Sequence, residues 1–281
     1  MEHADVVIVG AGRAGTGVGL AMAEAGTDVW FITRRPVPLV GPVRAVRMGA
    51  REAPRGRAMF IVAVPDQRIK ETLSELVEAG HVTEESVVGH LSGALPSFVI
   101  TDVARVAGAF SAHPLHAFPP PSPPRRMPPG TTVMVEGDTA GVASATVAFA
   151  KAGAVVAHID MSMKALCHAA AVLCSNLPAV LLFAAADLLK DCGVPDPVGA
   201  AARLLGSLAA NLASAPGAST VTGPFVRGDV ETVAQNIAAL EARDSDAAQL
   251  YRMLGARLVD RLRINRVLSE AAWKAIHETL K

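Results

Sequence analysis

The polar side chains of one otherwise apolar stretch, KALCHAAAVLCSN from Lys164 to Asn176, have the spacing of an active-site face on a helix. At about 100° per residue, Lys164 and His168 lie about 40° apart, and Ser175 returns to within about 20° of His168. Asn176 lies about 80° from His168 on the same wheel. Because a lone helical histidine is usually a core residue, we base the prediction of an active-site face on the whole stripe.

Two shorter motifs place histidines near the ends of predicted strands. In HLSG, His90 and Ser92 either line a pocket or form a hydrogen-bonded Ser-Gly turn. In SAHPLHAF, His113 and His116 flank Pro114, which disfavours the helix that would align two metal ligands. No third ligand is spaced nearby, so we predict no metal site.

A compact loop, TGPFVRGD, contains one arginine between two glycines. Arg227 has the chemistry to clamp a substrate carboxylate, and it could equally pair with Asp229 or Glu231. Asp229 is placed to cap the helix that continues through Val233.

The segment DVVIVGAGRAG couples a short β-branched strand to a glycine-rich loop and an alanine-rich helix. Gly10 permits a tight turn, Gly12 lets a pyrophosphate approach the backbone, and Gly15 allows close packing of helix on strand. The amides at the helix N-terminus would hold phosphates, with the helix dipole behind them. The segment therefore predicts a dinucleotide site.

The next strand, Asp28 to Thr33, ends in Thr33, Arg34 and Arg35, where an NAD-specific site would offer a carboxylate. A guanidinium suits a 2′-phosphate, so we expect NADP(H) to be preferred over NAD(H). Arg13, inside the glycine loop, is a further candidate contact. The alternative is that these arginines are solvated loop charges.

Strands alternate with helices through the first half of the chain, which predicts a doubly wound parallel sheet. The strand over residues 59–64 ends at Pro65, expected to line the cofactor crevice, and at Asp66, expected to cap the next helix. The remaining strands are expected at 5–9, 28–33, 45–48, 86–90, 109–113, 132–136 and 154–159. Proline makes the loop over 119–130 stiff and irregular. The fold class is α/β, with a Rossmann domain over 1–160 and an all-helical domain over 161–281.

Composition limits the kind of partner. The formal net charge is zero and no basic run is present, which argues against nucleic acid and acidic membrane surfaces. We see no secretory signal, and we expect buried thiols and a cytoplasmic location. The apolar stretch Ala165 to Leu189 is long enough to span a bilayer, but its polar residues predict a buried helix instead. A subunit interface is one place where this helix could be buried.

Taken together, HLSG, SAHPLHAF, the histidine helix and TGPFVRGD resemble bacterial Rossmann-like proteins whose C-terminal half is catalogued as a domain of unknown function. These proteins belong to a superfamily whose helical domain resembles that of 6-phosphogluconate dehydrogenase. The resemblance implies a Rossmann domain, a helical domain, usually a dimer, and an active site in the cleft between the domains. It covers nearly the whole chain.

Relatives with known chemistry, such as ketopantoate, pyrroline-carboxylate, β-hydroxyacid and prephenate enzymes, move a hydride between a nicotinamide and a small carboxylate-bearing substrate. The residue match is partial. Four residues after Lys164, where β-hydroxyacid enzymes place an asparagine, this chain has His168. The glycine that prephenate dehydrogenases carry soon after their His-Pro motif is absent after Pro114.

The sequence thus predicts an NADP(H)-dependent reductase of a small 2-oxo acid or related imine. His168, with an ordinary pKa near about 6.5, would donate the proton, and Lys164 is the second candidate donor. The other predicted substrate contacts are Asn176 and Ser175 to the carbonyl, Arg227 to the carboxylate, and Ser92 and His113 at the pocket wall.

Two alternatives belong to other classes. A non-catalytic nicotinamide-binding module needs Gly10, Gly12 and Arg34 but no polar stripe. A protein that acts on a carrier-bound substrate would use the proline-rich loop as a docking surface, which requires a flat apolar surface there. A deazaflavin in place of nicotinamide is also left open.

Overall fold

The computed structural model describes residues 5–34, 41–48, 50, 52–118 and 125–281. It divides into two compact units, Met1–Ser175 and Asn176–Lys281. The sequence placed the boundary at residue 160, where the last strand ends. The first unit also includes α5 (Lys164–Ser175), because the Lys164 side chain is buried against the sheet.

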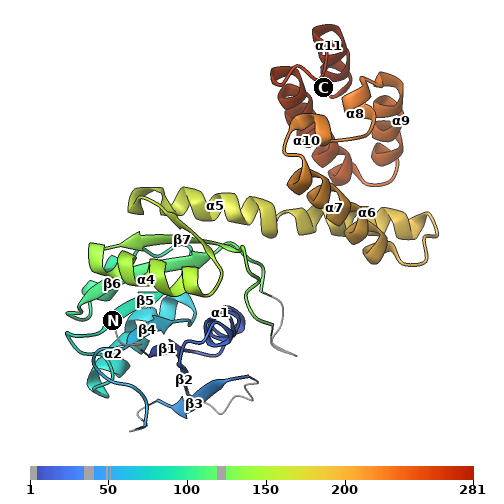
Figure 1. Cartoon of the computed structure of the whole chain (residues 1–281). Coiled ribbons are helices and arrows are strands. Elements are labelled where there is room, and N and C mark those ends of the chain that lie inside the picture. The colour runs from blue at the N-terminus through green and yellow to red at the C-terminus, as the bar shows by residue number, and fades with distance from the viewer. Residues whose placement is uncertain (1–4, 35–40, 49, 51, 119–124) are drawn as a thin grey trace. The chain divides into compact units, whose positions relative to one another are not determined.

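The first unit is built on an eight-stranded sheet with the order β3-β2-β1-β4-β5-β6-β7-β8 (Figure 1). The strands, all within two residues of the predicted bounds, are β1 (Val6–Val9), β2 (Val29–Thr33), β3 (Val43–Arg47), β4 (Met59–Val62), β5 (Val87–His90), β6 (Gly108–Pro114), β7 (Thr132–Gly137) and β8 (Val155–His158). The predicted α/β fold is confirmed.

One pairing departs from the predicted parallel sheet. Strand β7 runs antiparallel to β6, with His113 opposite Met134, whereas all the other pairs are parallel. An antiparallel neighbour needs no crossover helix. The described residues between these two strands accordingly form none, and the described part of the proline-rich segment, 125–130, contains neither helix nor strand.

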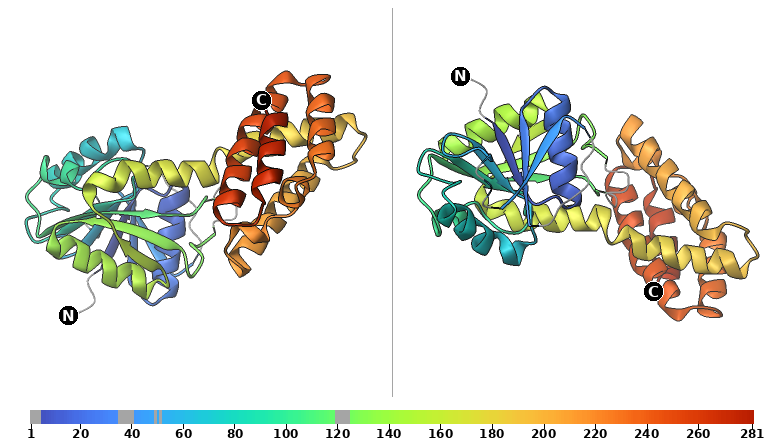
Figure 2. Two further views of the ribbon diagram at one scale, coloured as in Figure 1. Left: turned by 90° about the horizontal axis from the view of Figure 1, so that it is seen from above. Right: turned by 90° about the horizontal axis from the view of Figure 1, so that it is seen from below.

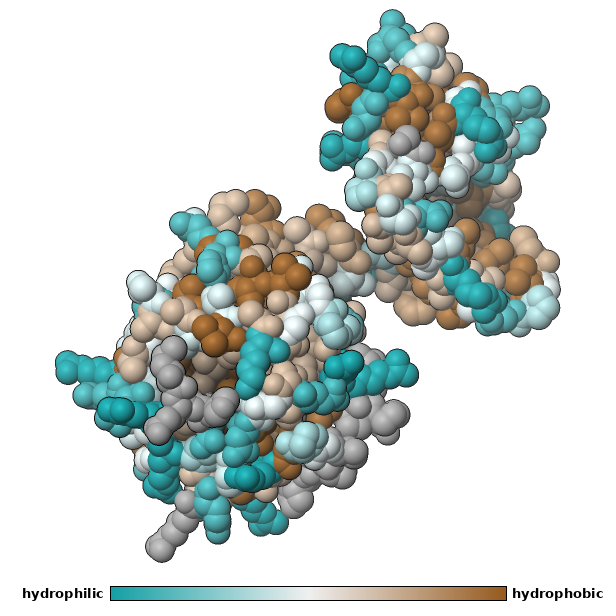
Figure 3. Space-filling model, in the orientation of Figure 1, coloured by the Kyte–Doolittle hydropathy of each residue, from teal (hydrophilic) through white to brown (hydrophobic). Residues whose placement is uncertain are grey.

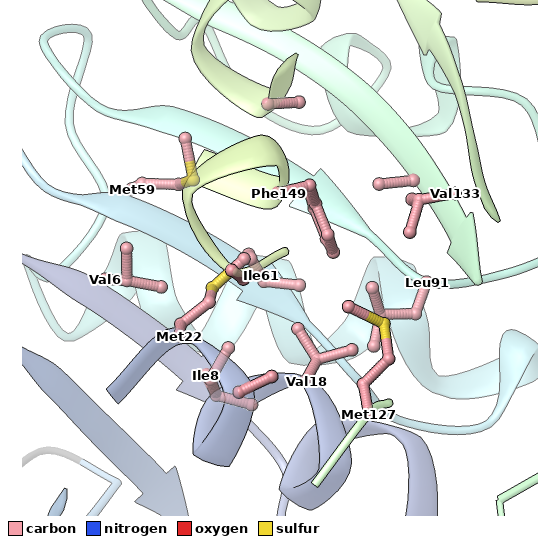
Figure 4. Close-up of a cluster of buried hydrophobic side chains, with 14 of the residues drawn as sticks. Val6, Ile8, Val18, Met22, Met59, Ile61, Leu91, Met127, Val133 and Phe149 are labelled. Carbon is pink, nitrogen blue, oxygen red and sulfur yellow. The ribbon is translucent and has the colours of Figure 1, made fainter. Parts of the chain in front are cut away.

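Helices cover both faces of the sheet (Figure 2). On one face, α1 (Arg13–Glu24) and α4 (Thr139–Lys151) pack on alternate strand residues such as Val6 and Ile8, in the cluster that Figure 4 shows. On the other face lie η1 (Asp66–Arg68), α2 (Ile69–Glu78) and α3 (Phe98–Thr101). Burial on both faces explains why the central strands are apolar throughout.

After β8, no strand occurs among the described residues. The elements are η2 (Met161–Met163), α5, α6 (Pro178–Asp191), α7 (Pro197–Ser214), η3 (Ala218–Thr220), α8 (Pro224–Arg227), α9 (Val230–Glu241), α10 (Ser245–Ile264) and α11 (Glu270–Thr279). The core of the second unit joins α9, α10 and α11 through Val233, Val259 and Ile276, each fully buried.

Two predicted helix caps have different outcomes. Asp229 caps α9, because its carboxylate accepts a hydrogen bond from the Thr232 amide at 3.1 Å. The predicted cap at Asp66 is wrong. Its carboxylate instead accepts a hydrogen bond from Ser92 at 2.8 Å, and the helix begins with the turn η1 and no side-chain cap.

Candidate active site

The glycine loop has the geometry that its spacing predicts. Gly10 has φ +103°, and a Cβ there would lie 2.7 Å from the Ala63 carbonyl oxygen. A Cβ on Gly15 would overlap the Gly10 carbonyl and lie 2.8 Å from Ala63 Cβ. Both glycines are therefore required by the turn and by close helix packing.

Gly12 differs from its neighbours because the protein itself does not require it. Its φ is −74°, which any residue can adopt, and a Cβ there would meet only the Ala63 oxygen at 4.0 Å. The space in front of Gly12 fits a ligand phosphate approaching the backbone and the N-terminus of α1. Arg13 is exposed in the first turn of α1, which carries no acidic residue.

A pocket of about 430 Å³ opens beside this loop, at the carboxyl ends of β1, β2 and β4. This is where a doubly wound sheet binds ligands. Its lining includes four of the predicted cofactor contacts, Gly10, Thr33, Arg34 and Pro65. The other lining residues are Val9, Ala11, Ile32, Met48, Val64, Arg68 and Thr72. Arg35 lies outside the described residues.

The pocket lining contains two arginines, and both pair with carboxylates of α2 that are not themselves part of the lining. The Arg34 guanidinium lies 2.7 Å from Glu75 and 3.8 Å from Glu71, and its pKa is raised by the hydrogen bond to Glu75. Arg68, which follows β4, donates to Glu71 at 3.0 Å. Of the cations that the sequence predicts for a 2′-phosphate, Arg34 lines the pocket, already paired with carboxylates, and the structure adds Arg68.

His90 supports the loop after β5. It is fully buried; its Nε2 donates to the Pro96 carbonyl at 3.2 Å, and its Nδ1 accepts from the Ser92 amide at 3.2 Å. Burial lowers its pKa to about 4, so the ring is neutral near pH 7. Of the two predicted alternatives for His90, the hydrogen-bonded turn is the one observed.

Ser92 belongs to the same turn. Its hydroxyl donates to Asp66 and accepts from the amides of Ala94 at 3.1 Å and Leu95 at 2.9 Å. Ser92 as a whole residue is 7% exposed. These bonds hold the loop 91–97 in the form that places Gly93 beside the histidines described next.

His113 and His168 meet at the end of β6. Their ring centroids lie 5.3 Å apart at an interplanar angle of 81°. Gly93 lies directly against both: a Cβ there would overlap His168 Nδ1 and lie 2.9 Å from His113 Nε2. Glycine at position 93 is therefore what allows the two imidazoles to come together.

The ring nitrogens of this pair have distinct environments. His113 Nδ1 donates to the Leu91 carbonyl at 3.1 Å, which leaves Nε2 as the acceptor in the neutral ring. Burial lowers the pKa of His113, with smaller lowering effects from His168 and Lys164. His168 Nδ1 is buried and has no hydrogen-bond partner among the described residues. Such an atom is suited to a proton shared with a bound polar molecule.

Lys164 is 2% exposed, which is rare for a lysine. Its ammonium donates to Ser111 Oγ and lies 3.6 Å from Glu136 Oε1. Glu136 also accepts from the amide and the hydroxyl of Ser97, at 2.8 and 2.7 Å. Burial lowers the pKa of Lys164, and Glu136 opposes that shift. These contacts favour a role for Lys164 in holding α5 on the sheet.

The last two residues of the predicted stripe lie at the exposed end of α5. Ser175 is exposed, and its hydroxyl donates to the Ala171 carbonyl at 2.7 Å, whereas Asn176 is exposed in the turn after α5. Pro178 begins a separate helix at its N1 position. The predicted angles between Lys164 and Asn176 require one continuous helix. Because α5 ends at Ser175, the angle predicted for Asn176 does not apply.

Two other predicted residues have local partners. Arg227 is exposed at the end of α8, 3.7 Å from Asp229, so the structural pairing considered for it is present. His116 packs edge-on against Phe118, with ring centroids 4.8 Å apart. The two histidines of SAHPLHAF therefore face different partners.

Sequence reasoning missed Glu136, Ser111, Gly93 and Arg68. Glu136 ends an otherwise apolar strand, and a charge in such a strand signals a buried partner. Arg68 stands in a loop at the carboxyl end of a parallel strand, which the topology of the fold places at the ligand crevice. Ser111 and Gly93 gave no separate signal.

Comparisons with known proteins agree with this architecture. Residues 131–258 match a domain of unknown function (DUF2520). No curated protein matches the chain. A proposed NADP oxidoreductase from Bacteroides fragilis is 22% identical, with a TM-score of 0.71 over 92% of this chain and 99% of the other. A Thermotoga maritima protein is 22% identical, with a TM-score of 0.72 over 93% and 99%.

The pyrroline carboxylate reductase of Plasmodium falciparum, solved with NADP bound, has a TM-score of 0.60 over 100% of both chains at 10% identity. At these identities the likeness establishes a shared fold. The matched domain of unknown function lies in the part of the chain where the motif resemblance implies one. The chain has a Rossmann fold, and its residues 131–258 are similar to the DUF2520 domain.

Proposed function

We propose that this protein is an NADP(H)-dependent oxidoreductase that reduces a small 2-oxo acid or related imine. The observation that carries the proposal is the pocket beside Gly10, with Arg34 and Arg68 in its lining. Two proteins of similar fold support it: one is described as an NADP oxidoreductase, and the other was solved with NADP bound.

The residues present fit the cofactor. Gly12 leaves room for a pyrophosphate at the N-terminus of α1, and the two arginines offer cations for a 2′-phosphate. A bound nicotinamide would supply or accept the hydride. The ends of β5 and β6, where His113 and His168 meet, are the neighbouring strand ends along the same edge of the sheet.

In this proposal, His168 supplies the proton to the oxygen or nitrogen that becomes negative as the substrate is reduced. Its Nδ1 is buried and has no hydrogen-bond partner in the described part of the chain, and the ring of His113 packs edge-on against it. Lys164 is committed to Ser111 and Glu136, which favours His168 as the donor. The substrate contacts of Ser175, Asn176 and Arg227 stay predictions.

The test is a screen of 2-oxo acids and cyclic imines for oxidation of NADPH, followed by the same assay on His168→Ala. With a substrate in hand, this variant is expected to lose roughly 10²-fold or more in turnover and still bind NADPH. His158→Ala is the matched control, because His158 is exposed on β8 and bonds Thr146.

Two results would overturn the proposal. Unchanged turnover in His168→Ala would remove the assigned donor. Binding of NADPH without turnover of any substrate in the panel would favour the non-catalytic nicotinamide-binding module instead.

A further inference from the structure

The pocket beside the glycine loop is bordered by charges from two separate loops. Arg34 follows β2 and Arg68 ends η1 after β4, and both line the same cavity. The sequence predicts phosphate contacts after β2, at Arg34 and Arg35, and in the glycine loop, at Arg13. The structure adds Arg68, which follows Arg34 by 34 residues and comes from the segment after β4.

Glu71 connects the two guanidiniums. Its Oε1 accepts from Arg68 at 3.0 Å and lies 3.8 Å from Arg34 Nη2, and Arg34 also bonds Glu75 at 2.7 Å. Both glutamates come from α2, one turn apart, so they lie on the same face of that helix and contact arginines that line the pocket. Among the described residues, these contacts join two cations and two anions.

The bridges are partly solvated, which makes them exchangeable. The side chains of Arg34 and Arg68 are each 44% exposed, and that of Glu71 is 54% exposed. Exposed ion pairs contribute little to stability because water and salt screen them. A phosphate dianion, with two charges and three acceptor oxygens, is a stronger partner for paired guanidiniums than one carboxylate.

Building on the proposed function, we propose that Arg68 and Arg34 together form the 2′-phosphate site of NADP(H), and that Glu71 occupies it until the phosphate displaces the carboxylate. Glu71 then has two effects. It holds both guanidiniums toward the pocket, and it opposes the dianion by like-charge repulsion. NADH has no 2′-phosphate, so its binding does not require Glu71 to move.

The experiment compares the affinities of the full-length protein for NADPH and NADH by nicotinamide fluorescence, in the wild type, Arg68→Ala and Glu71→Gln. Arg68→Ala is expected to weaken NADPH binding roughly tenfold or more, with NADH within about twofold. Glu71→Gln is expected to tighten NADPH binding about threefold and leave NADH unchanged. Glu78→Gln, exposed at the far end of α2, is the control.

A second pair of probes separates this inference from the proposed function. Adenosine 2′,5′-bisphosphate carries the phosphate without a nicotinamide, and adenosine 5′-monophosphate lacks the 2′-phosphate. Calorimetry is expected to show that Arg68→Ala weakens only the bisphosphate. This result would support the phosphate site even if no substrate were ever reduced.

Three outcomes would overturn the inference. Equal loss of NADPH and NADH in Arg68→Ala would make Arg68 a structural residue. Weaker NADH binding in Glu71→Gln would assign Glu71 to the ribose hydroxyls of NAD(H) instead. NADPH binding that is unaffected by either substitution would leave the oxidoreductase proposal standing and remove this one.

Discussion

At the scale of single residues, burial decides the protonation state of the histidines around the candidate site. His90 has hydrogen-bond partners for both ring nitrogens only as a neutral ring, since Nδ1 accepts and Nε2 donates. Protonation of Nδ1 would oppose the Ser92 amide and place a charge in a fully buried position. The protein therefore keeps His90 neutral over a wide pH range.

This burial predicts a specific loss of stability in acid. The pKa of His90 is about 4 in the folded state and near 6.5 when the chain is unfolded. Between these values the unfolded chain binds the extra proton, so the free energy of unfolding falls as the pH drops from about 6.5 to about 4. From pH 7 to pH 5 the share due to His90 is about 2 kcal/mol.

Urea unfolding of the wild type and of His90→Gln at pH 7 and pH 5 measures that share. The variant is expected to lose about 2 kcal/mol less than the wild type over this interval. His81 and His113, whose pKa values are also lowered by burial, remain in both proteins and cancel in the difference. Identical pH dependence in the two proteins would refute the assignment.

Single residues of the site were predictable from sequence where a local motif fixes the geometry. Gly10 and Gly15 have the roles that their spacing implied, because a strand, a tight turn and a helix determine them locally. The partnership of Lys164 with Glu136 was not predictable, because it joins residues from distant segments and Glu136 carries no motif. Gly93 acquires its importance only from two histidines of other elements.

At the scale of elements, α5 is fixed to the sheet by one buried polar network. Lys164, at its first turn, reaches Ser111 on β6 and Glu136 on β7. One turn later, His168 meets His113. The ion pair therefore determines where on the sheet the histidine lies, although it does not itself face solvent.

Removing the lysine is expected to be costly. Lys164→Met would leave the Glu136 carboxylate buried beside Ser97 without its cation, at a cost of about 3–5 kcal/mol in the free energy of unfolding. The double variant Lys164→Met, Glu136→Gln removes the charge and is expected to recover part of the loss. Lys151→Met, which removes an exposed lysine bonded to the Gly26 carbonyl, is the control.

Chemical unfolding followed by circular dichroism measures these differences. If Lys164→Met costs no more than Lys151→Met, the buried pair does not anchor α5. The same preparation can be titrated with NADPH, whose pocket lies at other strand ends and is expected to be little affected.

Elements were more predictable than their contacts. Most of the strands are short apolar runs bounded by turn residues, which is a local signal. The break between α5 and α6 falls just before Pro178, which begins α6. The predicted burial of this stretch is wrong for the single chain. Leu166 and Leu173 are each 63% exposed, and Phe183 is 58% exposed. Periodicity shows that a helix has an apolar face but not what covers that face.

At the scale of the whole molecule, this uncovered apolar surface is the main unexplained feature. Within the helical unit, Leu204 on α7 is also 73% exposed, and Figure 3 shows apolar residues at the surface of this unit. Pockets of about 260 and 330 Å³ also lie against α6, each with Leu181 and Ala185 in its lining. Large exposed apolar patches are unusual on monomers.

We propose that α5, α6 and α7 form the interface of a homodimer, as the motif resemblance implies. The stretch Met161–Asp191 is long and apolar enough to cross a membrane, and 6% of its apolar 18-residue segment is buried. One such helix is weak evidence for a membrane span. Its polar residues Asn176 and Asp187 favour a protein interface over lipid.

Light scattering after size-exclusion chromatography, without detergent, is expected to give the mass of a dimer. Leu173→Glu with Phe183→Glu is expected to give a monomer, because charges would be buried in the interface. Val147→Glu on α4 is the matched control, since Val147 is also 63% exposed. A wild-type monomer, or partition of the protein into lipid vesicles, would contradict the dimer.

The central claim, that the glycine loop binds NADP(H), is tested most directly by nucleotide titration of the wild type and Gly12→Val. Position 12 suits this test because its backbone accepts any residue and a Cβ meets only the Ala63 oxygen at 4.0 Å. Gly206→Ala is the control, because a Cβ there meets no atom within 4 Å.

Nicotinamide fluorescence gives the affinity, and the thermal midpoint of the free protein reports folding. The account predicts that the wild type binds NADPH more tightly than NADH, and that Gly12→Val loses saturable NADPH binding while keeping the wild-type midpoint. A wild type that binds neither nucleotide, or a Gly12→Val variant that binds NADPH as the wild type does, would contradict it.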